Sequence, residues 1–168
     1  PWSSGFGTKY ANPATLPTGT GEDVAFSPDS ADIALAHDNS PYITVYPWSS
    51  GFGTKYANPA TLPTGVASTG VAFSPDSADI AVACYNSPYI TVYPWSSGFG
   101  TKYANPSTLP AGSGHDVAFS PDGADIAVAH SNSPYISVYP WSSGFGTKYA
   151  NPATLPTGNG FGVAFSPI

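Results

Sequence analysis

Apolar residues occur along the chain in short runs, and each run is closed by Pro, Gly, Asn, Asp or Ser. From Val117 onward, VAFS ends at PDG, DIAVAH ends at SNSP, YISVYPW ends at SSG, and FGTKYAN ends at a proline-rich connection. Runs of this length, rich in β-branched and aromatic residues and bounded by turn residues, predict β-strands. None has the length or period of a helix. The pattern therefore predicts four strands and no helix in each unit.

The pattern recurs because the chain consists of near-identical units. The segment PWSSGFGTKYANP begins at Pro1, Pro47, Pro94 and Pro140, at spacings of 46 or 47 residues. Periods of this size are typical of solenoids, propellers and arrays. We treat residues 1–168 as one incomplete propeller domain whose repeats start at these four positions, with the last repeat truncated.

The third predicted strand of each unit carries large apolar groups on both faces. In YITVYPW, Ile43 and Val45 share one face, whereas Tyr46 and Trp48 share the other. Such strands suit small sheets packed between two neighbours, as in radially stacked blades. A parallel β-helix is the competing architecture, but its coils are usually shorter. We predict an all-β propeller of four-stranded antiparallel blades, with about three and a half blades in this chain.

A propeller segment of this size leaves its terminal blade faces uncovered. Each packed aromatic side chain buries ~150–250 Å², so a bare blade face exceeds the apolar patch that monomers tolerate. No polar capping unit is visible in the sequence. We therefore expect other copies of the chain, or further repeats of it, to complete the ring.

Composition narrows the class of partner. The formal net charge is −6 and only 8% of residues are charged, which gives no basic surface for nucleic acid. No apolar run approaches the ~20 residues that span a bilayer, so we expect no membrane partner. The basic residues form one column in the fourth predicted strand, where a lysine discourages edge-to-edge association. They are Lys9, Lys55, Lys102 and Lys148.

The stretch VAFSPDGADIAVA, followed by YISVY, resembles the WD-repeat family of β-propellers, and the match covers every unit. The chain is also similar to highly repetitive bacterial and bacteriophage propeller proteins of uncharacterised function. The Trp-Asp pair of the family is replaced by Tyr46-Pro47 and its equivalents, and its Gly-His pair survives only as Gly114-His115. The resemblance implies a non-enzymatic scaffold or binding module within a larger closed propeller. A lectin-like or adhesin propeller on a phage or cell surface is the alternative.

The aligned units differ mainly in the connection before the first strand and at the end of the second strand. Because strand direction alternates, both places lie on the same side of the ring. We interpret them as a candidate binding face for a protein or glycan ligand; unconstrained drift of loops is the competing interpretation. The candidate residues are Glu22, Asp23, His37, Asp38, Cys84, Tyr85, His115, Asp116, His130 and Ser131.

Catalytic and metal-binding chemistry finds little support. His37, Cys84 and His130 share a column, but stacked sheets lie ~10 Å apart and zinc ligands must approach to ~2.0–2.3 Å. We expect no metal site, no cofactor and no catalytic residue, and we interpret Cys84 as a small buried hydrophobe. The aspartate pairs, such as Asp29 and Asp32, recur at one turn in every complete unit. Repetition favours turn geometry over the single acid pair of a glycosidase.

A column of aromatic residues follows the third strand of each unit. These side chains could pack between blades or stack on sugar rings, and repeated sites would make weak sugar binding useful. Packing is the favoured interpretation. The column consists of Trp2, Trp48, Trp95 and Trp141, with Phe6 and its equivalents.

Overall fold

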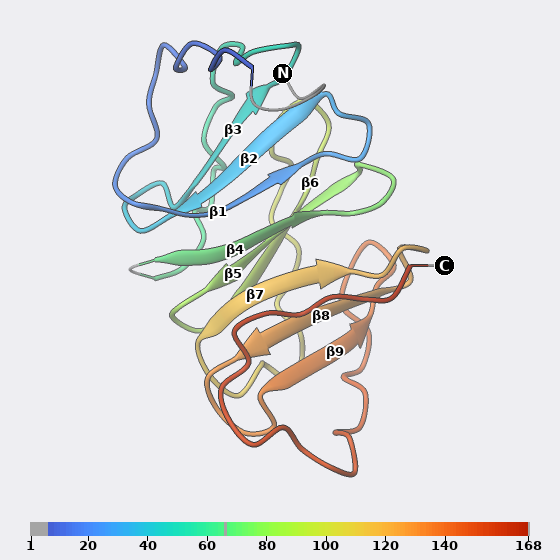
Figure 1. Cartoon of the computed structure of the whole chain (residues 1–168). Helices are drawn as coiled ribbons and strands as arrows, with labels where there is room; N and C mark the ends of the chain where they lie inside the picture. The colour runs from blue at the N-terminus through green and yellow to red at the C-terminus, as the bar shows by residue number, and fades with distance from the viewer. Residues whose placement is uncertain (1–6, 66, 168) are drawn as a thin grey trace.

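Three separate antiparallel sheets form the chain, as Figure 1 shows for the computed structural model, which describes residues 7–65 and 67–167. Each sheet has three strands in sequence order, and we call it a blade. The predicted all-β class and the repetition of antiparallel sheets are confirmed. The described part of the chain contains no apolar helix of membrane-spanning length. The strands are β1 (Gly21–Phe26), β2 (Asp32–His37), β3 (Ile43–Pro47), β4 (Ser68–Phe73), β5 (Asp79–Cys84), β6 (Ile90–Pro94), β7 (Gly114–Phe119), β8 (Asp125–His130) and β9 (Ile136–Pro140).

The prediction of four strands per blade is wrong. After β3, the segment FGTKYAN donates two backbone hydrogen bonds to that strand, from Gly53 N to Pro47 O (2.8 Å) and from Tyr56 N to Val45 O (3.0 Å). Bonded residues of an antiparallel ladder recur at every second position, but these donors are three residues apart. The segment therefore leaves the edge of β3 instead of following it as a strand.

The last predicted first strand, VAFS at 163–166, also forms no strand in the structure. Its equivalents β1, β4 and β7 each pair with the second strand of their own blade. Within the described residues, this segment has no such neighbour and lies against the third blade instead (Figure 1). Its sequence suits a strand, but it lacks the hydrogen-bonded ladder that defines one.

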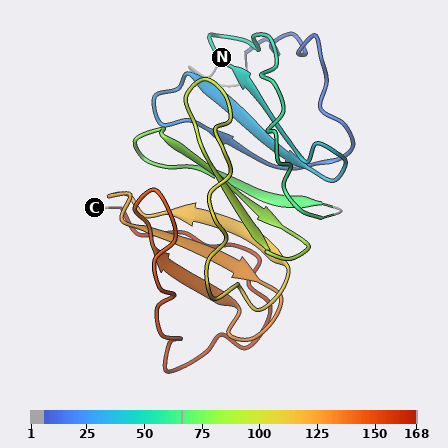
Figure 2. The ribbon, with the colours of Figure 1, turned by 180° about the vertical axis from the view of Figure 1, so that it is seen from behind.

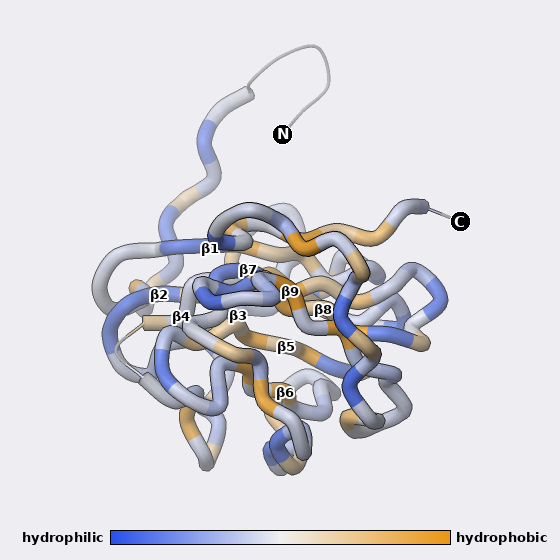
Figure 3. Tube along the Cα trace, turned by 90° about the horizontal axis from the view of Figure 1, so that it is seen from below, coloured by the Kyte–Doolittle hydropathy of each residue, from blue (hydrophilic) through white to orange (hydrophobic). Residues whose placement is uncertain are grey.

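Blades stack by placing a face of large side chains on a face of smaller ones. Ile43 and Val45 contribute to the smaller face of the first blade, and Tyr93 and Trp95 to the larger face of the second. The same arrangement joins the second and third blades. The predicted alternation along the third strand is therefore confirmed, since its two faces enter different interfaces. Figure 3 shows hydrophobic residues concentrated along the strands and hydrophilic ones in many of the connections.

Neighbouring blades approach most closely at their first strands. A Cβ atom placed on Gly70 of β4 would lie 2.8 Å from the Cα atom of Asp116 in β7. Beside it, Thr69 Oγ1 donates a hydrogen bond to Gly114 O at 2.6 Å. The long connections, such as the one from β6 to β7, lie behind the blades in Figure 1 and cross in front of them in the reverse view of Figure 2. Backbone-to-backbone packing at the first strands thus fixes how closely the blades can stack.

We expect Gly70→Ala to lower the free energy of unfolding by about 1–3 kcal/mol, because the added methyl meets backbone that cannot rotate away. Gly158→Ala is the matched control, since a Cβ there has no atom within 4 Å. Chemical denaturation of both variants measures the difference. Equal stability of the two variants would contradict the close approach at Gly70.

Candidate binding edge

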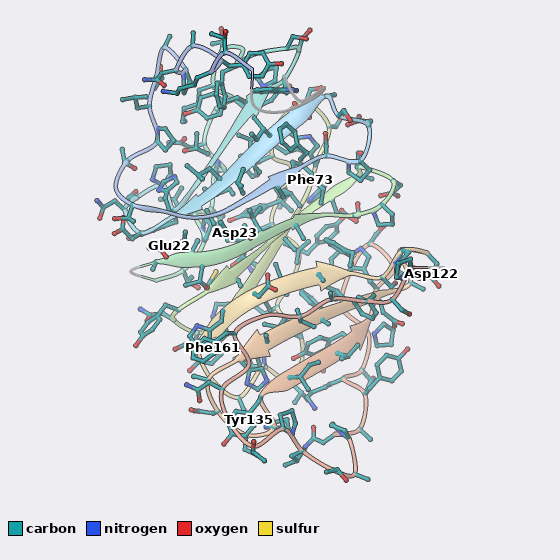
Figure 4. All side chains as sticks on the ribbon, viewed as in Figure 1. Glu22, Asp23, Phe73, Asp122, Tyr135 and Phe161 are labelled. Atoms are coloured by element: carbon teal, nitrogen blue, oxygen red, sulfur yellow. The ribbon has the colours of Figure 1, made fainter. Side chains whose placement is uncertain are left out.

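Both variable stretches of each unit lie at one edge of the blades, which we call the variable edge. Gly21, at the start of β1, pairs with His37, at the end of β2. Asp38 N donates to Thr20 O at 3.1 Å, and the second blade repeats this bond between Tyr85 N and Ala67 O. In Figure 4, Glu22, Asp23 and Phe161 lie at this edge, whereas Asp122 lies at the opposite one. The structure therefore brings the sequence-predicted candidates together along one side.

The candidates differ in how far they reach solvent. Glu22 is exposed and Tyr85 is 49% exposed. Phe161, which sequence reasoning did not select, is 72% exposed and packs on His115 with ring centroids 5.1 Å apart. Only part of the predicted set can therefore meet a ligand. Asp23, Asp38, His115, Asp116 and Ser131 are half-buried, and His37, Cys84 and His130 are buried.

His37, Cys84 and His130 occupy equivalent positions inside the blades, where they have a structural role. His37 Nε2 lies 3.0 Å from Thr44 Oγ1, and His130 Nε2 lies 3.0 Å from Ser137 Oγ. Burial lowers the pKa of both histidines and raises the pKa of the Cys84 thiol to about 11. These groups are neutral at pH 7. Among the described residues, no cluster of three or more His, Cys, Asp or Glu side chains could hold a metal ion.

Two of the candidate carboxylates accept hydrogen bonds from the backbone of the following unit. Asp23 Oδ2 accepts a hydrogen bond from Val71 N at 2.8 Å, and Asp116 Oδ2 accepts one from Val163 N at the same distance. In the unit that each carboxylate contacts, the equivalent residue is glycine: Gly70 for Asp23 and Gly162 for Asp116. This structural role was missed at the sequence level. The alternation of Asp and Gly between successive units is the signal that could have found it.

The opposite edge contains the recurring aspartate turns. Asp29 Oδ1 accepts from Ser27 Oγ (2.6 Å) and Ala31 N (3.1 Å), and the turns at Asp76 and Asp122 repeat both bonds. The serine hydroxyl bond, with the backbone bond, lowers the pKa of these carboxyls. The prediction of turn geometry is confirmed for this column.

The second aspartate of each pair has a further role, and we call Asp32, Asp79 and Asp125 the junction aspartates. Asp32 accepts hydrogen bonds from Trp95 Nε1 (2.8 Å) and Tyr56 OH (2.9 Å). One blade further on, Asp79 accepts from Trp141 Nε1 and Tyr103 OH, both at 2.9 Å. A junction aspartate therefore ties its own blade to the next blade and to the connection between them. Sequence reasoning missed this contact, whose partners stand in different units.

The tryptophan column packs between blades. Trp95 and Trp141 are 5% and 6% exposed. Trp95 makes edge-to-face contacts with Tyr56 and Phe99, at centroid distances of 5.1 and 5.0 Å. The packing interpretation is confirmed for these two indoles, which offer no open ring face to a sugar. Trp2 and Phe6 lie outside the described residues.

Comparison with known proteins identifies the fold. No family model matches the chain, and no curated protein matches it. Its structure is similar to a protein of Bacteroides fragilis provisionally assigned as a 6-phosphogluconolactonase (TM-score 0.68, 13% identity, 86% of this chain and 41% of that one). It is also similar to the WD40 repeats of RRP9 (TM-score 0.62, 16% identity, 80% and 39%) and to hydrazine synthase of Kuenenia stuttgartiensis (TM-score 0.56, 17% identity, 84% and 41%).

The chain spans about two-fifths of the length of these solved structures. Identities of this size show the fold and leave activity open. With the three stacked blades, the likeness to WD40 repeats supports a WD-repeat-like partial β-propeller. The link to bacteriophage proteins stays a prediction.

We expect Asp79→Ala to lower the free energy of unfolding by about 3 kcal/mol, because each buried donor left without a partner costs about 1–3 kcal/mol. The donors are the Trp141 indole and the Tyr103 hydroxyl. Asp76→Ala removes only bonds within one exposed turn, and we expect a loss of about 1 kcal/mol. Denaturant titration followed by tryptophan fluorescence measures both values. A larger loss in the turn variant would contradict the assigned role of Asp79.

We expect stability to decrease as the pH falls below about 6.5, before the carboxylates titrate. The folded-state pKa values of His37 and His130 are lowered by burial from 6.5, so the unfolded chain binds these protons first. Their contribution is complete above that pH and is lost below it, by at most ~1.4 kcal/mol per pH unit for each histidine.

The second blade provides the matched control for this pH dependence, since Cys84 occupies the histidine column there. The double variant H37C/H130C should show a flatter stability profile between pH 6.5 and 5. Thermal melts across this range measure the difference. An unchanged profile would show that the buried histidines do not cause the acid sensitivity.

Proposed function

We propose that the chain is a non-enzymatic binding scaffold whose variable edge contacts a protein ligand, and that its blades form part of a larger closed propeller. The proposal rests on the separation between the structural residues that every unit shares and the residues of the variable edge. Residues shared by all units form the junctions and turns, whereas exposed residues that differ between units gather at the variable edge. Binding residues commonly lie on loops that a rigid scaffold positions.

The state of the reactive groups supports a non-enzymatic role. A nucleophilic cysteine needs a lowered pKa and solvent access, but Cys84 is buried with a raised pKa. The junction aspartates Asp32 and Asp79 are occupied by indole and phenol donors. The turn aspartates hold their own turns. These aspartates therefore have structural partners.

The exposed residues of the variable edge favour a protein ligand. Aromatic side chains are enriched among the residues that carry binding energy in protein interfaces, and Tyr85 and Phe161 are exposed here. Glu22 adds an exposed carboxylate at the same edge, near the start of β1. The buried indoles of Trp95 and Trp141 give no comparable support to a glycan ligand.

Peptide-display selection against the immobilised chain tests the proposal. We expect the selected binders to lose at least roughly ten-fold in affinity for the variant E22A/Y85A, since truncation of a tyrosine that acts as a hot spot costs ~2 kcal/mol or more. The control variant S96A/S142A alters exposed residues that follow β6 and β9 at the opposite edge. It should bind as the unmodified chain does.

The outcomes separate the alternatives. Binders that respond only to S96A/S142A, or a selection that yields none, would overturn the variable edge as the binding site. Binding on a glycan array that is lost in E22A/Y85A would retain the site and replace protein by glycan as the ligand class.

A further inference from the structure

Within the described residues, the first blade presents an exposed face whose equivalent in the second blade is buried. Val24 and Phe26 of β1 are 55% and 51% exposed, whereas Val71 and Phe73 of β4 are 4% and 8% exposed. In the second blade, this large-residue face is covered by the smaller face of the preceding blade. In the first blade it forms an apolar groove lined by Leu16, Val24, Ile33, Leu35, Tyr46 and Phe52.

The third blade presents the complementary half of a junction. Asp125 accepts from Tyr149 OH at 3.0 Å, as the other junction aspartates accept from their tyrosines. Among the described residues, however, no indole reaches its second oxygen. Trp48 is in the opposite situation: it contacts Tyr10 edge-to-face at 5.1 Å, as Trp95 contacts Tyr56, yet its Nε1 has no acceptor in the described part of the chain. Trp48 and Asp125 therefore lack the partner that the other could supply.

A segment on the third blade lies where a further first strand would begin the next blade. Residues 159–167 lie on the third blade through bonds from Gly160 N to His130 O (3.1 Å) and from Val163 N to Asp116 Oδ2 (2.8 Å). Their VAFSP is identical to residues 24–28. Figure 3 shows hydrophobic colour along this segment at the surface of the molecule. Its outer edge is open to a strand of β2 type.

We propose that a second copy of this chain docks head to tail on the third blade, and that residues 159–167 replace β1 of that copy. The β2 and β3 hairpin of the second copy pairs with the segment, and the indole of the second copy's Trp48 donates to Asp125. This inference rests on the proposed membership in a larger propeller and names the partner. The internal junctions at Asp32 and Asp79 supply its geometry.

The exchange follows from the carboxylates at the first strands. If the second copy kept its own β1 on the third blade, its Asp23 would stand in the column that faces Asp116, and two carboxylates would adjoin. Residues 159–167 have Gly162 at this position, with its Cβ site 3.7 Å from Asp116 Oδ2. The segment thus fits the third blade where β1 does not.

Sequence identity makes the exchange conservative. Residues 140–158, which lead into the segment, are identical to residues 1–19. Exchange of identical elements between protomers is a low-cost route to association. Because the two surfaces are different, the contact is heterologous, and a pair of copies keeps one free head and one free tail.

Sedimentation of the full chain over a concentration series tests the proposal. We expect self-association that Asp125→Ala weakens roughly 10- to 100-fold, the effect of losing a hydrogen bond to a charged group. Trp48→Phe should weaken it similarly. Asp122→Ala, which removes a carboxylate from the same turn but outside the junction, is the control and should leave association unchanged.

Mixing the two weakened variants distinguishes this geometry from a symmetric dimer. The D125A copy retains Trp48 and the W48F copy retains Asp125, so together they form one intact junction. At a concentration at which the unmodified chain associates and each variant alone is monomeric, we expect the mixture to form a one-to-one dimer that does not extend. A monomeric unmodified chain, or a dimer insensitive to D125A, or a mixture that stays monomeric, would overturn the proposal.

Two further measurements keep the result interpretable. Thermal melts of D125A and W48F show whether each variant is folded, and a folded D125A that no longer associates supports the junction. Display binders of the variable edge are measured on monomeric D125A. Retained ligand binding without association supports the proposed scaffold and overturns only the head-to-tail contact.

Discussion

The stacking of the blades depends on a buried carboxylate that receives an indole N–H from the following blade and a phenol O–H from the intervening connection. Asp32 and Asp79 are 5% and 6% exposed, and a charge at this depth is costly unless its oxygens are hydrogen-bonded. Both oxygens of each carboxylate are satisfied across a blade boundary. Apolar contact alone would tolerate sliding of one sheet on another, whereas this bond geometry holds one relative position.

The two edges of the blades follow different periods. At the turn edge, every complete unit has the same aspartate, tryptophan and tyrosine, so each junction can be the same. At the variable edge, Asp23 and Asp116 alternate with Gly70 and Gly162. Asp23 accepts a hydrogen bond from the second blade, and Asp116 accepts one from the segment that follows the third blade; at Gly70 the backbones of two blades approach directly. Successive interfaces are therefore equal in their cores and different at their first strands.

Much of the fold is predictable because local chemistry determines it. The runs VAFS, DIALAH and YITVYPW contain β-strand formers bounded by turn residues, and strands β1, β2 and β3 overlap them. The alternation of side chains along β3 predicts two packing faces, because successive side chains of a strand point to opposite sides. The segment FGTKYAN was wrongly predicted to be a strand. Its residue types suit a strand, but a strand forms only where the backbone is hydrogen-bonded along β3. Only two bonds are made.

The candidate site was predictable in location but not in role. Divergence between units placed all candidates at one edge, since chain direction alternates between neighbouring strands. It could not separate exposed Glu22 from buried His37, because residue type does not reveal which side chains the next blade covers. The hydrogen bond between Asp32 and Trp95 could not be predicted from the sequence either. Its partners are distant in sequence, and each has an adequate local explanation: one as a turn residue, the other as a core aromatic.

Near-identical units create a problem of specificity that the variable columns can solve. Blades with identical faces can stack in any order, since every large face fits every smaller face. The Asp and Gly column discriminates between them: aspartate over glycine forms a hydrogen bond, whereas aspartate over aspartate places like charges together, which disfavours that order. Within one chain the connections set the order of the blades, so this discrimination acts on contacts between copies. It requires no external ligand, and it gives half-buried positions such as Asp23 and Asp116 a role that a binding surface alone does not explain.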